Sequence, residues 1–215
     1  MVSDPQTLVQ RAYLSIRAMA VAGELLAGTK LVVRPLSESL GLSATPIKSA
    51  LAALERDGFL TAIPNRGYFV PEISHADMLE IYEIREALDG IACRKVAGTP
   101  TAEAFVRDVL EPIYARQEIS VNNGDVTQLR DLDLEFHRAI WHAGGNKRLS
   151  QVADNLGGQI RLAWGRNPPW IVERAILEHR AIMDAIAACD PDAAEESART
   201  HVRQALAAFE RTNNG

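Results

Sequence analysis

The sequence has 215 residues and a formal net charge of −5, and 47% of its residues are hydrophobic. This length can hold one or two domains with buried cores, and we expect two. No uninterrupted apolar run is long enough to span a membrane, and charged residues such as Asp4 and Arg11 break up the N-terminal segment. We therefore expect neither a membrane span nor a secretory signal, and we place the protein in the cytoplasm.

The charge is spread unevenly along the chain. Residues 1–70 hold 7 Lys and Arg against 5 Asp and Glu, a net charge of +2, which leaves 16 against 23, or −7, for residues 71–215. A slightly basic head joined to an acidic body is compatible with DNA binding by the head. The difference is too small to establish that function by itself.

The N-terminal part has the pattern of a helix-turn-helix. Residues 7–26 carry apolar side chains at helical spacing, which predicts a first amphipathic helix. A short second helix follows, and Gly41 can take the left-handed position at its end. A third helix, which Ser43 or Thr45 can cap, has apolar residues at i, i+3, i+4 and i+7 before Gly58 stops it. Two helices joined by a tight turn that contains glycine are typical of this motif.

After the third helix the pattern changes from helical to extended. Residues 59–63 and 68–70 are rich in apolar and aromatic side chains, and the turn-forming residues 64–67 separate them. This arrangement predicts a small β-hairpin, or wing, beside the helix-turn-helix.

Several residues of the head are candidates for DNA contact. If the third helix enters the major groove, its N-terminal side chains meet base edges and phosphates. Arg34 could reach the backbone or a guanine edge, and Arg66, next to Gly67 at the wing tip, could enter the minor groove. Taken singly, each could equally be a solvated surface residue. The outward candidates on the third helix are Ser43, Thr45, Lys48 and Ser49.

Three stretches of the head resemble the winged head of GntR-family regulators: Leu40–Leu51 (LGLSATPIKSAL), Leu54–Leu60 (LERDGFL) and Asn65–Val70 (NRGYFV). The resemblance covers about residues 8–70 and implies a transcriptional regulator that binds operator DNA. The family usually has arginine where this chain has Ala44 and glutamate where it has Ser49. We therefore expect an altered base readout, carried by Arg34 and Lys48.

From Ser74 onward the sequence contains no convincing strand, and turn signals divide it into helical stretches. Short connections between long helices predict an antiparallel bundle, and Pro112 should kink the second stretch. The predicted fold is mainly α, with a winged helix-turn-helix at residues 1–72 and a six- or seven-helix bundle at 73–215. The predicted stretches are 74–97, 101–121, 125–143, 146–166, 170–189 and 191–212.

One carboxylate and three imidazoles in the body have the composition of a metal site. Asp133 and His137 are four residues apart, so a helix places them on the same face. His179 and His201 each lie in the middle of a later helical stretch. Together the four could provide the protein ligands of a zinc, nickel or manganese ion. Each histidine alone is more often a core or surface residue than a ligand.

The same region resembles the FCD ligand-binding domain over residues 76–210, on four motifs: Asp133-x-x-Phe136-His137-Arg138-x-Ile140, Gly145-Asn146, Glu178-His179-Arg180-x-Ile182 and His201. The resemblance implies a divalent metal ion, zinc in the first place and nickel or manganese as alternatives. It implies a small organic acid, a carboxylate effector, that completes the coordination. Metal-free members that bind acyl-CoA lack this ligand set. The implied ligands are Asp133, His137, His179 and His201.

Arginines of the body are candidates for binding the effector. Arg85 lies where FCD domains commonly have arginine, which implies a clamp for the effector carboxylate. The alternative for Arg85 is an ion pair with Glu86 or with a neighbouring helix. The further pocket candidates are Arg138, Asn155, Arg161 and Trp164.

These features predict a homodimeric regulator whose two heads bind a palindromic operator, with the effector changing their spacing. A metal-dependent hydrolytic enzyme is the first alternative, because a metal ion with an open position can activate water. The head, which an enzyme would not need, and the lack of a clear general base beyond Glu135 or Glu178 argue against it. The second alternative is a regulator whose metal is purely structural.

Overall fold

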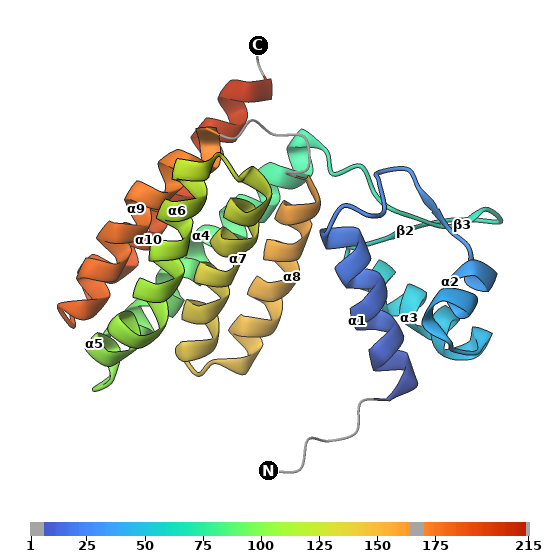
Figure 1. The fold of residues 1–215 in the computed structure, drawn as a ribbon, viewed down its shortest axis with the longest axis horizontal. Coiled ribbons are helices and arrows are strands. Elements are labelled where there is room, and N and C mark those ends of the chain that lie inside the picture. Colours follow the sequence, from blue (N-terminus) through green and yellow to red (C-terminus); the bar gives the residue numbers. More distant parts are fainter. Residues whose placement is uncertain (1–6, 164–169, 214–215) are drawn as a thin grey trace. The chain divides into compact units, whose positions relative to one another are not determined.

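The computed structural model describes residues 7–163 and 170–213. The chain is mostly helical with one small antiparallel sheet, as the sequence predicts (Figure 1). It splits into two compact units, Met1–Ile73 with Gly158–Gly165, and Ser74–Gly157 with Arg166–Gly215.

Three helices form the framework of the first unit: α1 (Leu8–Val21), α2 (Val33–Leu40) and α3 (Ala44–Arg56). The Thr7 side chain caps α1 by accepting a hydrogen bond from the backbone of Gln10. Gly41 adopts the predicted left-handed conformation at the end of α2, with φ of 62°. The prediction that α1 continues to residue 26 is wrong, because the chain turns at Gly23, whose φ is 79°. The fully buried core includes Ile16, Ile47, Leu51, Leu54 and Phe59.

The wing is a sheet of three strands, β1 (Lys30–Leu31), β2 (Thr61–Ile63) and β3 (Gly67–Phe69), in the order β1-β3-β2. The predicted hairpin of β2 and β3 is confirmed. Tyr68 in the central strand pairs with Leu31 on one side and Ala62 on the other. The sequence gives no sign of β1, because two residues are too few to show the alternation of a strand.

The second unit is a helical bundle. The predicted stretch 101–121 is interrupted, as Pro112 suggested: the π turn Val106–Leu110 joins two helices within it. Pro112 lies in the first turn of the second of these helices, where it cannot donate a hydrogen bond to the preceding turn. The helices after residue 73 are α4 (His75–Ala97), α5 (Ala102–Phe105), α6 (Glu111–Asn123), α7 (Val126–Ala143), α8 (Lys147–Ala163), α9 (Trp170–Ala187) and α10 (Pro191–Asn213). All belong to this unit except the part of α8 from Gly158 onward, which is assigned to the first unit.

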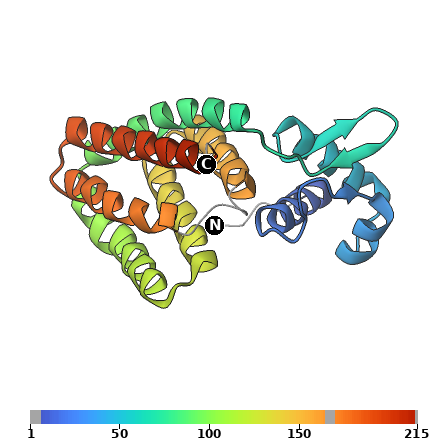
Figure 2. The same ribbon diagram turned by 90° about the horizontal axis from the view of Figure 1, so that it is seen from above.

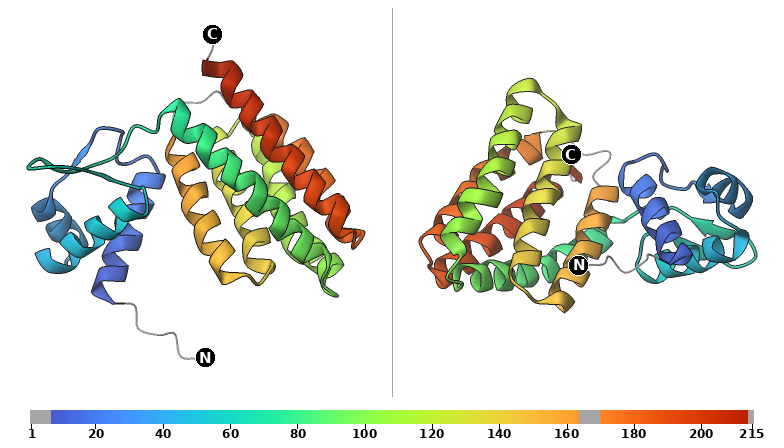
Figure 3. Two further views of the ribbon diagram at one scale, coloured as in Figure 1. Left: turned by 180° about the vertical axis from the view of Figure 1, so that it is seen from behind. Right: turned by 60° about the horizontal axis from the view of Figure 1, so that its bottom comes forward.

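Helix α4 begins at a capping box. The Ser74 hydroxyl accepts from the backbone N–H of Asp77, and the Asp77 carboxylate accepts from the backbone N–H of Ser74. From there α4 runs along α10, as Figures 2 and 3 show. Helix α9 packs against α10 and α7. The largest fully buried side chains of this unit are Trp141, Tyr82 and Phe136. No helix among the described residues is long and apolar enough to cross a membrane.

Candidate metal centre and nucleic-acid interface

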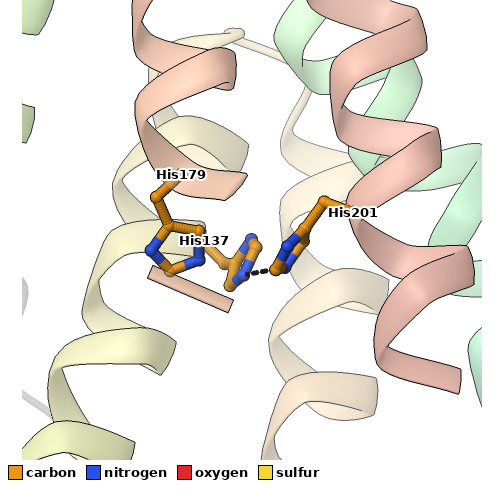
Figure 4. Close-up of side chains that lie close together, drawn as sticks. All are labelled: His137, His179 and His201. Carbon is orange, nitrogen blue, oxygen red and sulfur yellow. Dashed lines mark hydrogen bonds between the residues drawn. The ribbon is translucent and has the colours of Figure 1, made fainter. Parts of the chain in front are cut away.

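Three helices of the bundle bring three imidazoles together. Helix α7 carries His137, α9 carries His179 and α10 carries His201, and all three side chains are buried. One ring nitrogen from each lies within 4.8 Å of the others (Figure 4). The sequence predicted this convergence, and the structure brings the three rings into one cluster that could hold a metal ion.

Asp133 lies beside this cluster. It stands one helical turn before His137 on α7, and its Oδ1 atom is 3.5 Å from Nε2 of His179 and 3.9 Å from Nε2 of His137. The Nε2 atoms of His137 and His201 are 3.2 Å apart. Asp133 thus adjoins two of the three rings, and the three imidazoles alone form the close cluster.

The opposite edge of each ring faces an oxygen atom. Nδ1 of His179 lies 3.1 Å from Oε1 of Gln117, and Nδ1 of His201 lies 3.0 Å from Oε2 of Glu178. Nδ1 of His137 lies 3.6 Å from Oδ2 of Asp89. Ligand histidines commonly donate their second ring N–H to such an oxygen, which leaves the other nitrogen free for a metal ion. Gln117, Glu178 and Asp89 are therefore placed to orient the rings. The sequence pointed to none of the three for this role.

Burial favours the neutral form of the His137 and His179 rings. It lowers the pKa of His137 and of His179 well below the ordinary value, because a charged ring is poorly solvated there and Arg85 adds repulsion. Burial also raises the pKa of Asp133, against the opposing attraction of Arg85. Neutral imidazoles have the free lone pair that a cation requires.

One buried ring nitrogen of the cluster is available to a metal ion. Nε2 of His179 is buried and has no hydrogen-bond partner. A buried polar group without a partner costs about 1–3 kcal/mol, so native proteins rarely leave one unused. A cation between His179 and Asp133 would satisfy this nitrogen. Three imidazoles and one carboxylate are also the donor types that zinc and related ions take.

Arg85 is buried in α4 and forms an ion pair, as the alternative to an effector clamp expected, but its partner is Asp89 of the same helix. Its Nε donates to Oδ2 of Asp89 at 3.1 Å, and its guanidinium lies 6.0 Å from the centre of the Trp141 ring. The indole N–H of Trp141 donates to the other oxygen of Asp89. Arg85, Asp89 and Trp141 thus form a buried network that adjoins His137. Glu86 instead contacts Arg203 on α10.

The other effector candidates belong to α7, α8 and the segment that follows α8 in the sequence. Arg138 is exposed on α7, and its Nε donates to Asp154 at 2.7 Å. Asn155 and Arg161 lie on α8, half-buried and buried respectively, and α8 contributes none of the clustered imidazoles. Trp164 lies outside the described residues.

The candidate DNA-contacting residues of the head are exposed. Those of α3 share one solvent-facing side, whereas Ile47 and Ala50 on the opposite side are fully buried. The Arg34 side chain is 89% exposed and pairs with Glu38, an exposed contact that DNA could replace. The exposed candidates are Arg34, Ser43, Thr45, Lys48, Ser49, Arg66 and Gly67.

Two family models match the chain. The model of bacterial regulatory proteins of the gntR family matches residues 8–70, and the model of the FCD domain matches residues 80–204. The chain belongs to the GntR family of regulators and has an FCD domain. It is therefore a transcriptional regulator of the GntR/FCD type.

Relatives agree with this assignment. The chain is 29% identical to a probable D-xylose utilization operon transcriptional repressor of Paenarthrobacter nicotinovorans, over 90% of this chain and 84% of that one. It is 26% identical to an uncharacterized transcriptional regulator of Bacillus subtilis, YdhC, over 88% of this chain and 85% of that one. These relatives are transcriptional regulators, which argues against the hydrolytic enzyme.

A solved structure has the same fold. Escherichia coli McbR matches with a TM-score of 0.77 and 24% identity, over 99% of this chain and 100% of that chain. This likeness supports the fold independently of the family models.

Proposed function

We propose that this GntR/FCD regulator binds a divalent metal ion in its helical unit and that a small carboxylate metabolite, bound at the same site, controls its affinity for operator DNA. The observation that carries the proposal is the buried Nε2 of His179, which faces Asp133 at 3.5 Å and has no hydrogen-bond partner. Asp133, His137, His179 and His201 would hold the ion. Zinc suits this donor set best, with nickel and manganese as alternatives.

The charge of the site supports an anionic effector. Asp133 is the single charged side chain among the four proposed ligands, so a divalent ion would keep a positive charge there. When bound, the ion would supply an electrophilic centre for a carboxylate oxygen. Arg85 adds a buried positive charge close by, although Asp89 already accepts a hydrogen bond from it. We propose Arg85 as a contact for the effector, and Arg138, Asn155 and Arg161 only as more distant candidates.

The head would carry the DNA contacts, through the exposed side of α3 and the wing. Lys48 and Arg66 provide positive charge for phosphates, and the hydroxyls of Ser43, Thr45 and Ser49 can donate to phosphate oxygens. Arg34 would add a contact at the start of α2. A homodimer working on cytoplasmic DNA would place two such heads on a palindromic operator.

The test is an electrophoretic mobility shift with the DNA upstream of the gene that encodes the protein. Zinc-loaded protein is titrated with sugar acids and short carboxylates, and wild type is compared with His201→Ala. His142→Ala is the matched control, because His142 is 55% exposed and pairs with Asp154 outside the cluster. We expect wild type and the control to respond to one class of carboxylate and His201→Ala to lose the response.

Two results would contradict this proposal. A protein that forms no salt-sensitive specific complex with any effector would not act on this DNA. If a chelator lowers the melting temperature but leaves the effector response intact, the metal ion is purely structural.

A further inference from the structure

Helix α6 supplies none of the proposed ligands, yet one of its side chains reaches the cluster. Gln117 is completely buried, with 0% of its surface exposed. Both ends of its amide are used: Nε2 donates to the backbone oxygen of Leu132 at 3.1 Å, and Oε1 lies 3.1 Å from Nδ1 of His179. A buried amide that satisfies both ends is held in one orientation.

This orientation determines which nitrogen of His179 carries the proton. The backbone oxygen of Leu132 can only accept, so the NH2 group of Gln117 must face it, and the amide oxygen must then face His179. Because that oxygen also only accepts, Nδ1 of His179 must donate to it. The lone pair of the neutral ring is then on Nε2, which points toward Asp133.

Gln117 also connects two parts of the cluster. Leu132, which accepts its hydrogen bond, directly precedes Asp133 in α7. The ring of His179 is further restrained by Phe136, also on α7, whose ring stacks on it with centroids 4.0 Å apart and planes 12° from parallel. Stacking restrains the tilt of the ring, while the bond to Gln117 determines its rotation within the plane.

We infer that Gln117 is a positioning residue for the cation site: it sets the tautomer and the direction of His179 and ties that ring to the backbone beside Asp133. The inference rests on the proposed function, because a positioning role requires that these residues bind a metal ion. Hydrogen-bond partners of ligand histidines typically contribute 10- to 100-fold to metal affinity.

The test is a zinc titration of the metal-free full-length protein in competition with a chromophoric chelator. Gln117→Met has a similar volume but neither hydrogen-bonding group. The matched control is Ser120→Ala, because Ser120 lies on the same helix, is completely buried and contacts Gln128 at 2.6 Å. We expect about a 10- to 100-fold weaker zinc affinity for Gln117→Met and less than a threefold change for the control.

The melting temperatures of the metal-free variants separate positioning from general stability. Both substitutions remove hydrogen bonds of a buried side chain and should lower the melting temperature, but only Gln117→Met should weaken zinc binding strongly. Equal zinc affinities for Gln117→Met and wild type would overturn the inference and leave the metal site intact. A wild-type protein that binds no zinc would instead overturn the proposed function, and the inference with it.

A second measurement uses wild-type protein and so does not depend on a variant that folds. Nitrogen-15 NMR of the zinc-loaded protein reports which ring nitrogen of each histidine carries the proton. We expect a protonated Nδ1 and a metal-bound Nε2 for His179. The reverse assignment for His179 would overturn the inference.

Discussion

The Nε2 atoms of His137 and His201 lie 3.2 Å apart, although the two residues are on different helices. Nδ1 of His201 also lies 3.0 Å from a carboxylate oxygen of Glu178, which can only accept. If Nδ1 carries the ring proton, Nε2 of His201 presents its lone pair to His137. Without a cation, Nε2–H of His137 then donates to this lone pair, whereas a bound cation would replace that proton and accept the lone pairs of both nitrogens. This relationship predicts that metal removal destabilises the bundle.

A chelator should therefore lower the free energy of unfolding of wild type but not of His201→Ala. With free zinc at about 100 times its Kd, binding to the folded state adds about 2.7 kcal/mol. Thermal denaturation with zinc and with excess chelator measures this difference. His142→Ala should keep the wild-type difference. An equal effect of zinc on wild type and His201→Ala would contradict the prediction.

The metal-free protein should lose stability as the pH falls below about 6.5, the ordinary pKa of histidine. Burial lowers the pKa of His137 and His179 in the folded state, so between those lowered values and 6.5 the unfolded chain binds more protons. The contribution of these two histidines to the free energy of unfolding is complete above the pKa of the unfolded chain, and it is lost as the pH falls through the pKa of the folded protein. Each such proton gives a slope of about 1.4 kcal/mol per pH unit.

Urea denaturation of the chelator-treated protein at several pH values measures this slope. His179→Gln removes one titrating ring. It should therefore reduce the slope of the free energy of unfolding against pH by up to the contribution of one proton, about 1.4 kcal/mol per pH unit. A slope that does not change in this variant would mean that His179 does not titrate differently in the folded and unfolded states.

In the head, Lys48→Ala and Arg66→Ala should each weaken DNA binding, because each removes a positive charge from the exposed side of α3 or from the wing. A lost phosphate contact lowers the slope of log K against log salt by about 0.9. Lys147→Ala, which removes an exposed charge from the start of α8, is the control. DNA-binding isotherms at several salt concentrations give the salt slope of each variant and distinguish the two head variants from the control. Identical salt slopes in all three variants would rule out phosphate contacts by Lys48 and Arg66.

At the start of α4, Ser74→Ala should reduce the free energy of unfolding by about 1 kcal/mol. The substitution removes the hydroxyl that accepts from the backbone of Asp77. Ser74→Thr keeps a hydroxyl that can accept from the Asp77 backbone and donate to the Asp77 carboxylate, and it should retain most of the stability. Urea denaturation at neutral pH compares the two variants. If both are equally unstable, the cap does not contribute.

In helix α8, Gly157→Ala should destabilise the protein although alanine favours a helix by about 1 kcal/mol. A Cβ atom at this position would lie 2.8 Å from Cδ1 of Leu134 and 2.8 Å from Cη2 of Trp141. Trp141 is fully buried and cannot move aside, so overpacking of about 1–3 kcal/mol outweighs the gain. Gln151→Ala, at an exposed position of the same helix, should not destabilise. Thermal denaturation of the two variants shows whether overpacking or the helix propensity of alanine is the larger effect at position 157.

The sequence pattern predicts most of this fold because the helix boundaries have chemical signals. Gly41 ends α2 in the predicted left-handed conformation, and the interruption that Pro112 predicts is present. The sequence pattern overestimates the length of α1. Residues 22–26 continue the apolar pattern, but the conformation of Gly23 ends the helix earlier. Strand β1 depends on pairing with β3, a tertiary contact that no local pattern reveals.

The candidate site is predictable only in part. Asp133 and His137 share a helical face at a spacing of four, and imidazoles are conspicuous in a chain with five histidines. Gln117 and Asp89 cannot be found in this way, because a glutamine or an aspartate in a helix is ordinarily a solvated side chain. Their burial is a property of the assembled bundle. The spacing of four between Arg85 and Asp89 is the one local signal for the buried pair.

The origin of the three rings in helices α7, α9 and α10 has a consequence for biosynthesis. A growing chain that has emerged from the ribosome through α9 has two of the three imidazoles and lacks His201. A cation that needs all three would bind weakly to such a partial chain and tightly once α10 has packed against α4. Cation capture would thus mark the moment at which the bundle closes, and nascent chains would not compete with finished molecules for scarce metal.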